Sequence, residues 1–187
     1  MTPPSKADTS RVFFAVWPDA SVRATLASLA RDCAAQAGGR PAVSSNLHLT
    51  LAFVGEVATS RVATLRAIGL AASSAAAPFT LTLDRIGAFR SAGIAWVGAA
   101  TLPPELERIV RELNGELSNA GFPTERRAFQ PHVTLARRCR KAANPELAAP
   151  IPWRVESVAL NVSESLRGGV SYRALAEWPL PGRAPDR

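Results

Sequence analysis

Cysteine, lysine and histidine are all scarce in this chain of 187 residues. Its two cysteines, Cys33 and Cys139, lie far apart, so their spacing indicates neither a disulfide framework nor a zinc site, and free thiols are expected. No stretch approaches the roughly 20 apolar residues of a membrane span. Residues 1–10 contain a lysine but no following apolar run, which argues against a signal peptide. These absences predict a cytoplasmic protein that does not enter a membrane.

Positive charge comes almost entirely from arginine, because Lys6 and Lys141 are the only lysines in a chain of net charge +7. Such an excess attracts polyanions, and arginine suits bidentate phosphate recognition. A hydrophobic fraction of 47% and a charged fraction of 20% are typical of a globular protein and exclude wholesale disorder. The length predicts one domain, over residues 11–180, between disordered tails at residues 1–10 and 181–187. We expect a monomer.

Hydrophobic periodicity divides the chain into interleaved strands and helices. Strands are predicted at residues 12–17, 47–54, 79–89, 94–98, 129–136, 153–162 and 170–178, with a hairpin between 79–89 and 94–98. Helices are predicted between an Asp19 N-cap and Gly38, over residues 59–73, and between Pro103 and Gly121. Neighbouring strands are close enough to form antiparallel hairpins, which favours an α+β fold with helices against the apolar sheet faces.

One four-residue pattern occurs twice and contains both histidines of the chain: residues 48–51 read HLTL, and residues 132–135 read HVTL. Each copy lies in an alternating strand, where residues two apart share a face. The first strand should therefore bury Leu47, Leu49, Leu51 and Phe53. The opposite face should present an imidazole beside a hydroxyl in each copy: His48 with Thr50, and His132 with Thr134. If the two strands face one another, four polar groups surround one point.

Two histidines are suited to cleaving a phosphodiester without a metal ion. The reaction needs a base for the nucleophile and an acid for the leaving oxygen, and imidazole can serve as either near neutral pH. A single histidine on a strand is more often a hydrogen-bonded surface residue, but the repetition of the pattern argues against that interpretation here. A zinc site is the weaker alternative, because no Cys, Asp or Glu joins the motifs at ligand spacing.

With these motifs the sequence resembles the 2H phosphoesterases, and most closely their RNA 2′,3′-cyclic phosphodiesterase branch, once called 2′-5′ RNA ligase. The resemblance covers most of the chain. The two histidine motifs carry it, in the segments HLTLAFVG (48–55) and FQPHVTLAR (129–137), with support from RVFFAVWP (11–18), ALNVSE (159–164) and YRALAEWPL (172–180).

The resemblance implies two pseudo-symmetric lobes, each an antiparallel sheet backed by helices, around a central groove that contains both motifs. It also implies hydrolysis of a terminal RNA 2′,3′-cyclic phosphate to a 2′-phosphomonoester, with no metal or cofactor, and in some members a reversible 2′-5′ ligation. On this chain His48 would be the proton donor and His132 the proton acceptor, although sequence does not decide which is which. Thr50 and Thr134 match phosphate-binding threonines. Arg137 matches a phosphate-binding arginine, but strict alternation would turn it away from His132.

Further residues are candidates for contact with RNA. Basic side chains flank the second motif and could follow an RNA backbone, or could form a solvated charged loop pair: Arg126, Arg127, Arg138, Arg140 and Lys141. The aromatic residues that could stack on a terminal base are Phe14, Trp17, Trp96 and Tyr172, although most strand aromatics are core residues. Tyr172 and Ser163 are groove residues by resemblance.

Three functions remain open at this point. The leading hypothesis is a cyclic phosphodiesterase acting on RNA ends, tRNA fragments among them. A second keeps the site but changes the substrate to 2′-5′ oligoadenylate or a small cyclic nucleotide such as ADP-ribose cyclic phosphate. A third is a non-catalytic module that binds RNA ends, for which replacement of the histidines would leave affinity intact.

Overall fold

The computed structural model of the chain describes residues 9–125, 127–142, 147–167 and 169–182. Its strands are β1 (Thr9–Val16), β2 (Arg40–Pro41), β3 (Leu49–Ala58), β4 (Phe79–Leu83), β5 (Arg85–Phe89), β6 (Ile94–Gly98), β7 (His132–Arg137), β8 (Ile151–Val155), β9 (Ser157–Leu166) and β10 (Gly169–Pro179). Its helices are α1 (Ala20–Ala37), α2 (Val62–Ser74) and α3 (Pro104–Asn119), with the short 3₁₀ segments η1 (Ser44–Asn46), η2 (Thr59–Arg61) and η3 (Arg90–Ala92). The predicted α+β class is confirmed.

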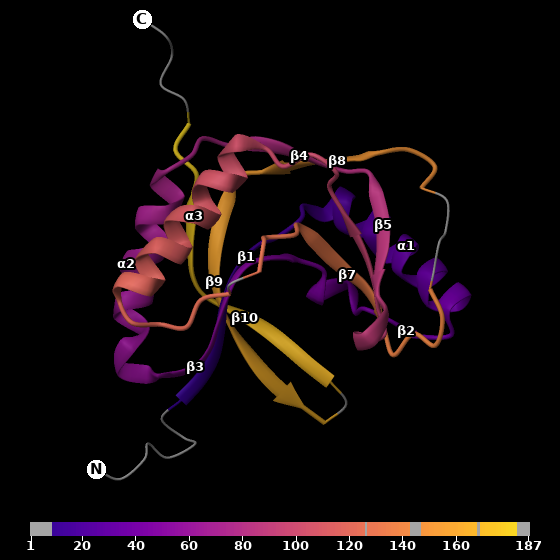
Figure 1. Cartoon of the computed structure of the whole chain (residues 1–187), viewed down its shortest axis with the longest axis horizontal. Coiled ribbons are helices and arrows are strands. Elements are labelled where there is room, and N and C mark those ends of the chain that lie inside the picture. Colours follow the sequence, from indigo (N-terminus) through magenta and orange to yellow (C-terminus); the bar gives the residue numbers. More distant parts are fainter. Residues whose placement is uncertain (1–8, 126, 143–146, 168, 183–187) are drawn as a thin grey trace, which may run out of the picture.

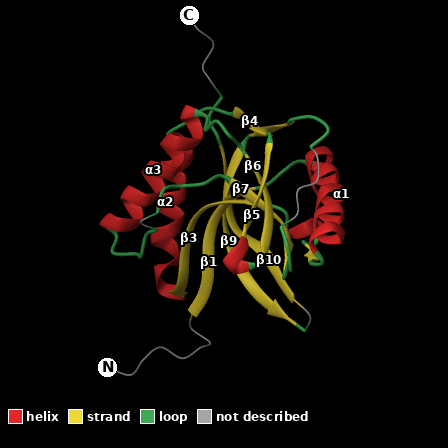
Figure 2. Cartoon of the chain, turned by 45° about the vertical axis from the view of Figure 1, so that its right-hand side comes forward, coloured by secondary structure: helices red, strands yellow, loops and turns green. Residues whose placement is uncertain are grey.

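Antiparallel strands form one main sheet in the order β10-β9-β1-β3-β7-β6-β5, and β2 pairs with β7. The first lobe comprises β10, β9, β1 and β3, and the second comprises β7, β6, β5 and β2. These lobes are joined by one residue pair, Leu49 on β3 with Val133 on β7. Figure 2 shows the sheet between the helices of the two sides.

Helices α1 and α3 each follow a strand of one lobe but pack against the other lobe. Helices α2 and α3 lie on the first lobe, whereas α1 lies on the second (Figure 1). Yet α1 follows β1, a strand of the first lobe, and packs against β7; α3 follows β6, a strand of the second lobe, and packs against α2 and β3. Neither lobe is therefore a continuous segment of the chain.

Helix α1 has the predicted ends. The carboxylate of Asp19 accepts hydrogen bonds from the backbone N–H groups of Ser21 and Val22, at 2.7 and 3.0 Å, and so satisfies donors that the first helical turn leaves unpaired. Gly38 ends the helix in the left-handed conformation, with φ of 65°. Cys33 faces the core, and burial raises the pKa of its thiol to about 11. Cys33 and Cys139 are both free, as predicted.

Two of the predicted strands are each broken in the middle, and the strand predicted at residues 129–136 begins only at His132. Residues 79–89 divide at Asp84 into β4 and β5, and residues 153–162 divide at Glu156, between β8 and β9. Strands β4 and β8 leave the main sheet and pair with each other. The break at Asp84 is closed by its carboxylate, which accepts from the Ala100 N–H at 2.8 Å. The predicted hairpin survives as β5 and β6.

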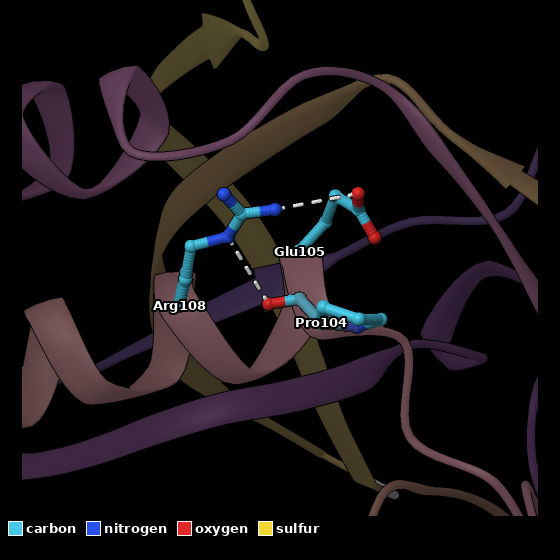
Figure 3. Close-up of polar contacts among 3 residues, drawn as sticks. All are labelled: Pro104, Glu105 and Arg108. Carbon is cyan, nitrogen blue, oxygen red and sulfur yellow. Dashed lines mark hydrogen bonds and ion pairs between the residues drawn. The ribbon is translucent and has the colours of Figure 1, made fainter.

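Helix α3 begins with a local ion pair shown in Figure 3. Arg108 approaches the carboxylate of Glu105 at 3.4 Å and donates from Nε to the carbonyl of Pro104. Both side chains are partly exposed, so the pair contributes little to stability. A hollow of about 490 Å³ adjoins this turn, and its lining residues are Ser74, Ala75, Ala76, Ala77, Glu105, Arg108, Pro181 and Gly182. None of them is a predicted site residue.

The predicted tails lie largely outside the described residues, although Thr9 and Ser10 already belong to β1. Leu180 is buried, and its N–H donates to the carbonyl of Glu156 at 2.7 Å. Among the helices that the structure describes, none has the length and apolar character to cross a membrane.

Gly69 of α2 packs directly on the sheet. A Cβ at this position would lie 2.3 Å from the Trp178 ring and 3.0 Å from Phe14. We expect Gly69→Ala to lower the free energy of unfolding by about 1–3 kcal/mol, because overpacking outweighs the higher helix propensity of alanine. Gly115→Ala in α3 is the control, since its Cβ would meet nothing within 4 Å, and it should raise stability by about 0.5–1 kcal/mol. Urea unfolding measures both; equal effects would contradict the packing argument.

Candidate active site

The two histidine motifs meet at the junction of the lobes. Leu49 and Val133, which pair across the junction, occupy the same position in the two motifs, directly after the histidine. The motifs are therefore related by a local two-fold arrangement. Leu49 and Val133 are buried, whereas His48, Thr50, His132 and Thr134 are all partly exposed. These four side chains lie on one side of the sheet, called the histidine face below.

Each imidazole is held by a backbone carbonyl two residues earlier in the chain. His48 Nδ1 lies 2.7 Å from the oxygen of Asn46, and His132 Nδ1 lies 2.8 Å from the oxygen of Gln130. A carbonyl only accepts, so Nδ1 must carry the hydrogen in both rings. In the neutral ring Nε2 is then the free base, and in the charged ring it is the proton that can be donated. Both rings thus offer Nε2 for proton transfer.

His48 lies in an aromatic cage. Its ring centroid is 4.9 Å from that of Trp17 and 5.0 Å from those of Phe13 and Tyr172. The indole N–H of Trp17 donates to Asn161 Oδ1 at 3.1 Å, and the buried Asn161 amide in turn donates to the Ala159 carbonyl. The cage therefore restricts the His48 ring from several sides.

His132 has a smaller set of aromatic neighbours. Phe89 meets it edge-on with centroids 5.0 Å apart, and Trp96 lies at 6.2 Å. The indole of Trp96 covers Gly87 of the neighbouring strand, where a Cβ would lie only 2.2 Å from the ring. A glycine at position 87 is thus required for the Trp96 ring to occupy this place.

Burial and charge act on both histidines in the same direction. The pKa of His48 is lowered to about 4, chiefly by removal from water and further by the nearby charges of Arg137 and His132, against the opposing hydrogen bond to Asn46. Burial is also the main cause that lowers the pKa of His132, again with a contribution from Arg137. Both rings are therefore neutral at pH 7. Arg137 lies close enough to act on both.

A β-bulge explains how Arg137 reaches the histidine face. The register between β6 and β7 shows the bulge. Trp96 opposes Thr134, and Ile94, two residues before Trp96, opposes Arg137. Because Trp96 and Ile94 share a face, Thr134 and Arg137 share it too, although three residues separate them. Leu135 has no partner on β6 and is the extra residue of the bulge. Strict alternation, which would turn Arg137 away, does not hold here.

The first motif contains an equivalent bulge, and it overturns one prediction. On β1, Ala15 opposes Thr50 and Phe13 opposes Phe53, so Leu51 is left without a partner. Phe53 consequently lies on the histidine face and is 48% exposed, whereas the sequence pattern predicted it to be buried. The other three predicted core residues of this strand, Leu47, Leu49 and Leu51, are buried.

The flanking basic residues differ in their surroundings. Arg126 lies outside the described residues. Arg127 is exposed and pairs with Glu125 at 2.8 Å, which raises the arginine's pKa. Arg138 is exposed with a positive φ of 56°, and exposed Arg140 follows beside the end of α1, where its N–H donates to the Ala37 carbonyl. No described contact ties these residues to the histidines.

Sequence reasoning missed several residues of the site. Phe14 was a candidate for stacking on a base, but it is fully buried on the far side of the sheet against α2; its neighbour Phe13 faces His48 instead. Phe89 and Asn161 were not predicted, because neither belongs to a motif. Tyr172 does lie beside His48, and Ser163 opposes it on β9.

Metal ligands do not gather near the motifs. Within the described ranges, no group of three or more His, Cys, Asp or Glu side chains is arranged to hold a metal ion.

Comparison with known proteins agrees with the repeated motif. The model of the 2′-5′ RNA ligase superfamily matches residues 12–166, a span that contains both histidines. The chain belongs to this superfamily. A relative from Escherichia coli K12, named RNA 2′,3′-cyclic phosphodiesterase, is 31% identical over 92% of this chain and 98% of its own. A Thermus thermophilus relative of the same name is 33% identical over 92% of this chain and 91% of its own.

Solved structures of the superfamily share this architecture. E. coli LigT complexed with 3′-AMP is 31% identical, with a TM-score of 0.77 over 92% of this chain and 99% of that one. Protein TT0787 of T. thermophilus has a TM-score of 0.78 over 93% of this chain and 100% of that one, at 28% identity. The MHV ns2 PDE domain, at 8% identity and a TM-score of 0.53, shares the fold alone. The resemblance recognised in the sequence is confirmed.

Histidine titration tests the electrostatics of the site. In the free protein we expect both imidazoles to titrate below pH 6.5, with His48 near 4, because burial disfavours the charged form. Saturating inorganic phosphate should raise both pKa values, since an anion between the rings stabilises their charged forms. Two-dimensional NMR of the ring nitrogens reads pKa and tautomer together. A pKa above 7 in the free protein, or a proton on Nε2 in the neutral rings, would contradict this account.

Proposed function

We propose that this protein hydrolyses terminal 2′,3′-cyclic phosphates of RNA to 2′-phosphomonoesters by metal-independent catalysis with two histidines. One observation carries the proposal: two equivalent histidines meet across the single joining pair of the lobes, each with its Nδ1 bound to a carbonyl and its Nε2 available. The names of the relatives, RNA 2′,3′-cyclic phosphodiesterase, supply the substrate class.

The reaction assigns one proton transfer to each ring. Nε2 of His132 accepts a proton from water as the water oxygen attacks phosphorus, and Nε2 of His48 donates a proton to O3′ as the P–O3′ bond breaks. Water is thereby added across that bond, and the phosphate stays on O2′. Thr50 and Thr134 hold the non-bridging oxygens. Arg137 offsets the negative charge that develops on them.

The lowered histidine pKa values constrain this mechanism. An acid must hold a proton, yet burial keeps His48 neutral at pH 7 in the free protein. The negative charge of the bound phosphodiester offsets this cost, so the acid is charged chiefly when substrate is present. The site thus favours the productive protonation state in the complex over the free protein.

Alternative activities use the same groups. A 5′-hydroxyl in place of water would give 2′-5′ ligation. Hydrolysis of 2′-5′ oligoadenylate or of a small cyclic nucleotide would keep both histidines but change the contacts beyond the phosphate. A non-catalytic module for RNA ends would keep affinity and yield no product. Three further statements stay predictions. Sequencing of cellular RNA ends tests tRNA fragments as the substrate, gel filtration tests the monomeric state, and cell fractionation tests the cytoplasmic location.

The first experiment uses an RNA oligonucleotide ending in a 2′,3′-cyclic phosphate, incubated in excess EDTA with the wild type, His48→Ala and His132→Ala. We expect wild-type conversion to a 2′-phosphate, and a loss of roughly 10²–10⁴-fold in each variant, the usual contribution of one acid or base. Chromatography against 2′- and 3′-phosphate standards identifies the product. Full activity in either variant would refute the mechanism. If EDTA inhibited the wild type and added metal restored activity, the site would be metal-dependent.

The pH dependence of the rate provides a separate test. Both free-protein pKa values lie below 6.5, and catalysis needs one ring charged and one neutral, so kcat/KM should peak below pH 6.5 and fall about tenfold per pH unit well above it. The kcat profile should extend to higher pH, because bound phosphate raises the pKa of the acid. A kcat/KM that stays constant to pH 8 would be incompatible with two low pKa values.

A further inference from the structure

Asn161 is a buried polar side chain on the histidine face. Among the residues that the structure describes, Asn161 and Ser73 are the two buried polar side chains, at 1% and 2% exposure. The hydroxyl of Ser73 donates locally, to the Leu70 carbonyl of its own helix. Asn161 lies on β9 directly opposite Phe13, and residues opposite one another on antiparallel strands share a face. Since Phe13 contacts His48, Asn161 lies on the His48 side of the sheet.

Both ends of the Asn161 amide have a partner, and the two partners fix its orientation. Oδ1 accepts from the indole N–H of Trp17 at 3.1 Å, and Nδ2 donates to the carbonyl of Ala159 at 3.0 Å. An indole nitrogen only donates and a carbonyl only accepts, so a flipped amide would break both bonds. A leucine of similar volume would fill the same space without this requirement, so packing alone does not call for an amide here.

Trp17 joins this amide to the His48 ring. It follows Val16, the last residue of β1, and precedes α1, so it lies in a segment that connects the two lobes. From the α1 side, Arg23 donates to the carbonyl of Pro18 at 2.9 Å. The ring centroids of Trp17 and His48 are 4.9 Å apart, with 40° between the ring planes. The first lobe thus holds the indole at its N–H while the ring lies against His48.

The hydrogen bond at Nδ1 leaves the His48 ring one freedom of movement. It ties Nδ1 to the Asn46 carbonyl, but it does not prevent the ring from tilting about that atom, which would move Nε2. A contact on the ring itself removes this freedom. The Trp17 indole supplies such a contact, and its own position depends on the bond to Asn161.

We infer that Asn161 is a positioning residue for the reaction: it fixes the Trp17 indole against His48 and so keeps Nε2 of His48 directed at the phosphate. This inference rests on the proposed function and adds to it a residue that acts on the imidazole through another side chain. If Asn161 acts only through Trp17, breaking their hydrogen bond from either side has the same consequence, and removing both partners has no further one.

Three variants test the inference on RNA ending in a 2′,3′-cyclic phosphate: Asn161→Leu, Trp17→Phe and the double variant. Asn161→Leu removes the amide and Trp17→Phe removes the indole N–H, so each breaks the bond between them. We expect each to lower kcat by roughly 10- to 100-fold with KM nearly unchanged, because the imidazole is misplaced whereas the phosphate contacts remain. The double variant should lose no more than either single variant, because the two positions are coupled.

Titration of His48 examines the same contact without substrate. A loosened indole admits water to the imidazole, so both single variants should raise the pKa of His48 from about 4 towards its ordinary value. The charges that act on this ring, those of Arg137 and His132, are unchanged in the variants, so the rise reports the packing. Two-dimensional NMR of the ring nitrogens measures this pKa even if the wild type opens no cyclic phosphate, so failure of the proposed function leaves this test intact.

Ser73→Ala is the matched control, because it removes the other buried polar side chain, on α2, and should change neither kcat nor the pKa of His48. Losses that multiply in the double variant would overturn the inference, since Asn161 would then act independently of Trp17. An unchanged pKa of His48 in both single variants would overturn it as well. If Asn161→Leu fails to fold, Trp17→Phe decides alone: a lower kcat with a raised pKa of His48 supports the inference, and wild-type values refute it.

Discussion

The site depends on one backbone pairing, between Leu49 of β3 and Val133 of β7. It joins the two lobes and places equivalent residues of the two motifs on either side of a local two-fold arrangement. The buried Leu49 and Val133 anchor the junction from the core side, so the histidines before them and the threonines after them must lie on the opposite face. The geometry of the candidate site therefore follows from the packing beneath it.

Burial at this junction orders both histidines but weakens their affinity for protons. The aromatic cage of His48 and the rings beside His132 hold the imidazoles in place, and the Nδ1 contacts select one tautomer. The same surroundings remove water and lower both pKa values. In the free protein, the contacts that fix the imidazole rings thus also lower their affinity for protons. An anionic ligand would offset this loss of proton affinity. Under the proposed mechanism, the charge of the substrate thus takes part in catalysis.

Sequence reasoning was accurate wherever a local pattern carried the information. The Asp19 cap, the Gly38 end of α1 and a helix between Pro103 and Gly121 follow from side-chain spacing and short-range hydrogen bonds, and the structure has all three. It was wrong where pairing between strands overrides alternation. The bulges at Leu51 and Leu135 and the breaks at Asp84 and Glu156 depend on partner strands far away in the chain. Phe53 was consequently predicted to be buried.

The sequence by itself determined the family, the fold class and the two motifs, because the repeated pattern is local and contains every histidine of the chain. Only the tertiary structure decided which aromatic residues surround each imidazole, which ring nitrogen is free, and that Arg137 and Phe53 turn toward the site. These features arise from contacts such as Phe13 with His48 and Thr134 with Trp96. Such contacts join residues remote in the chain, and no periodicity within one segment encodes them.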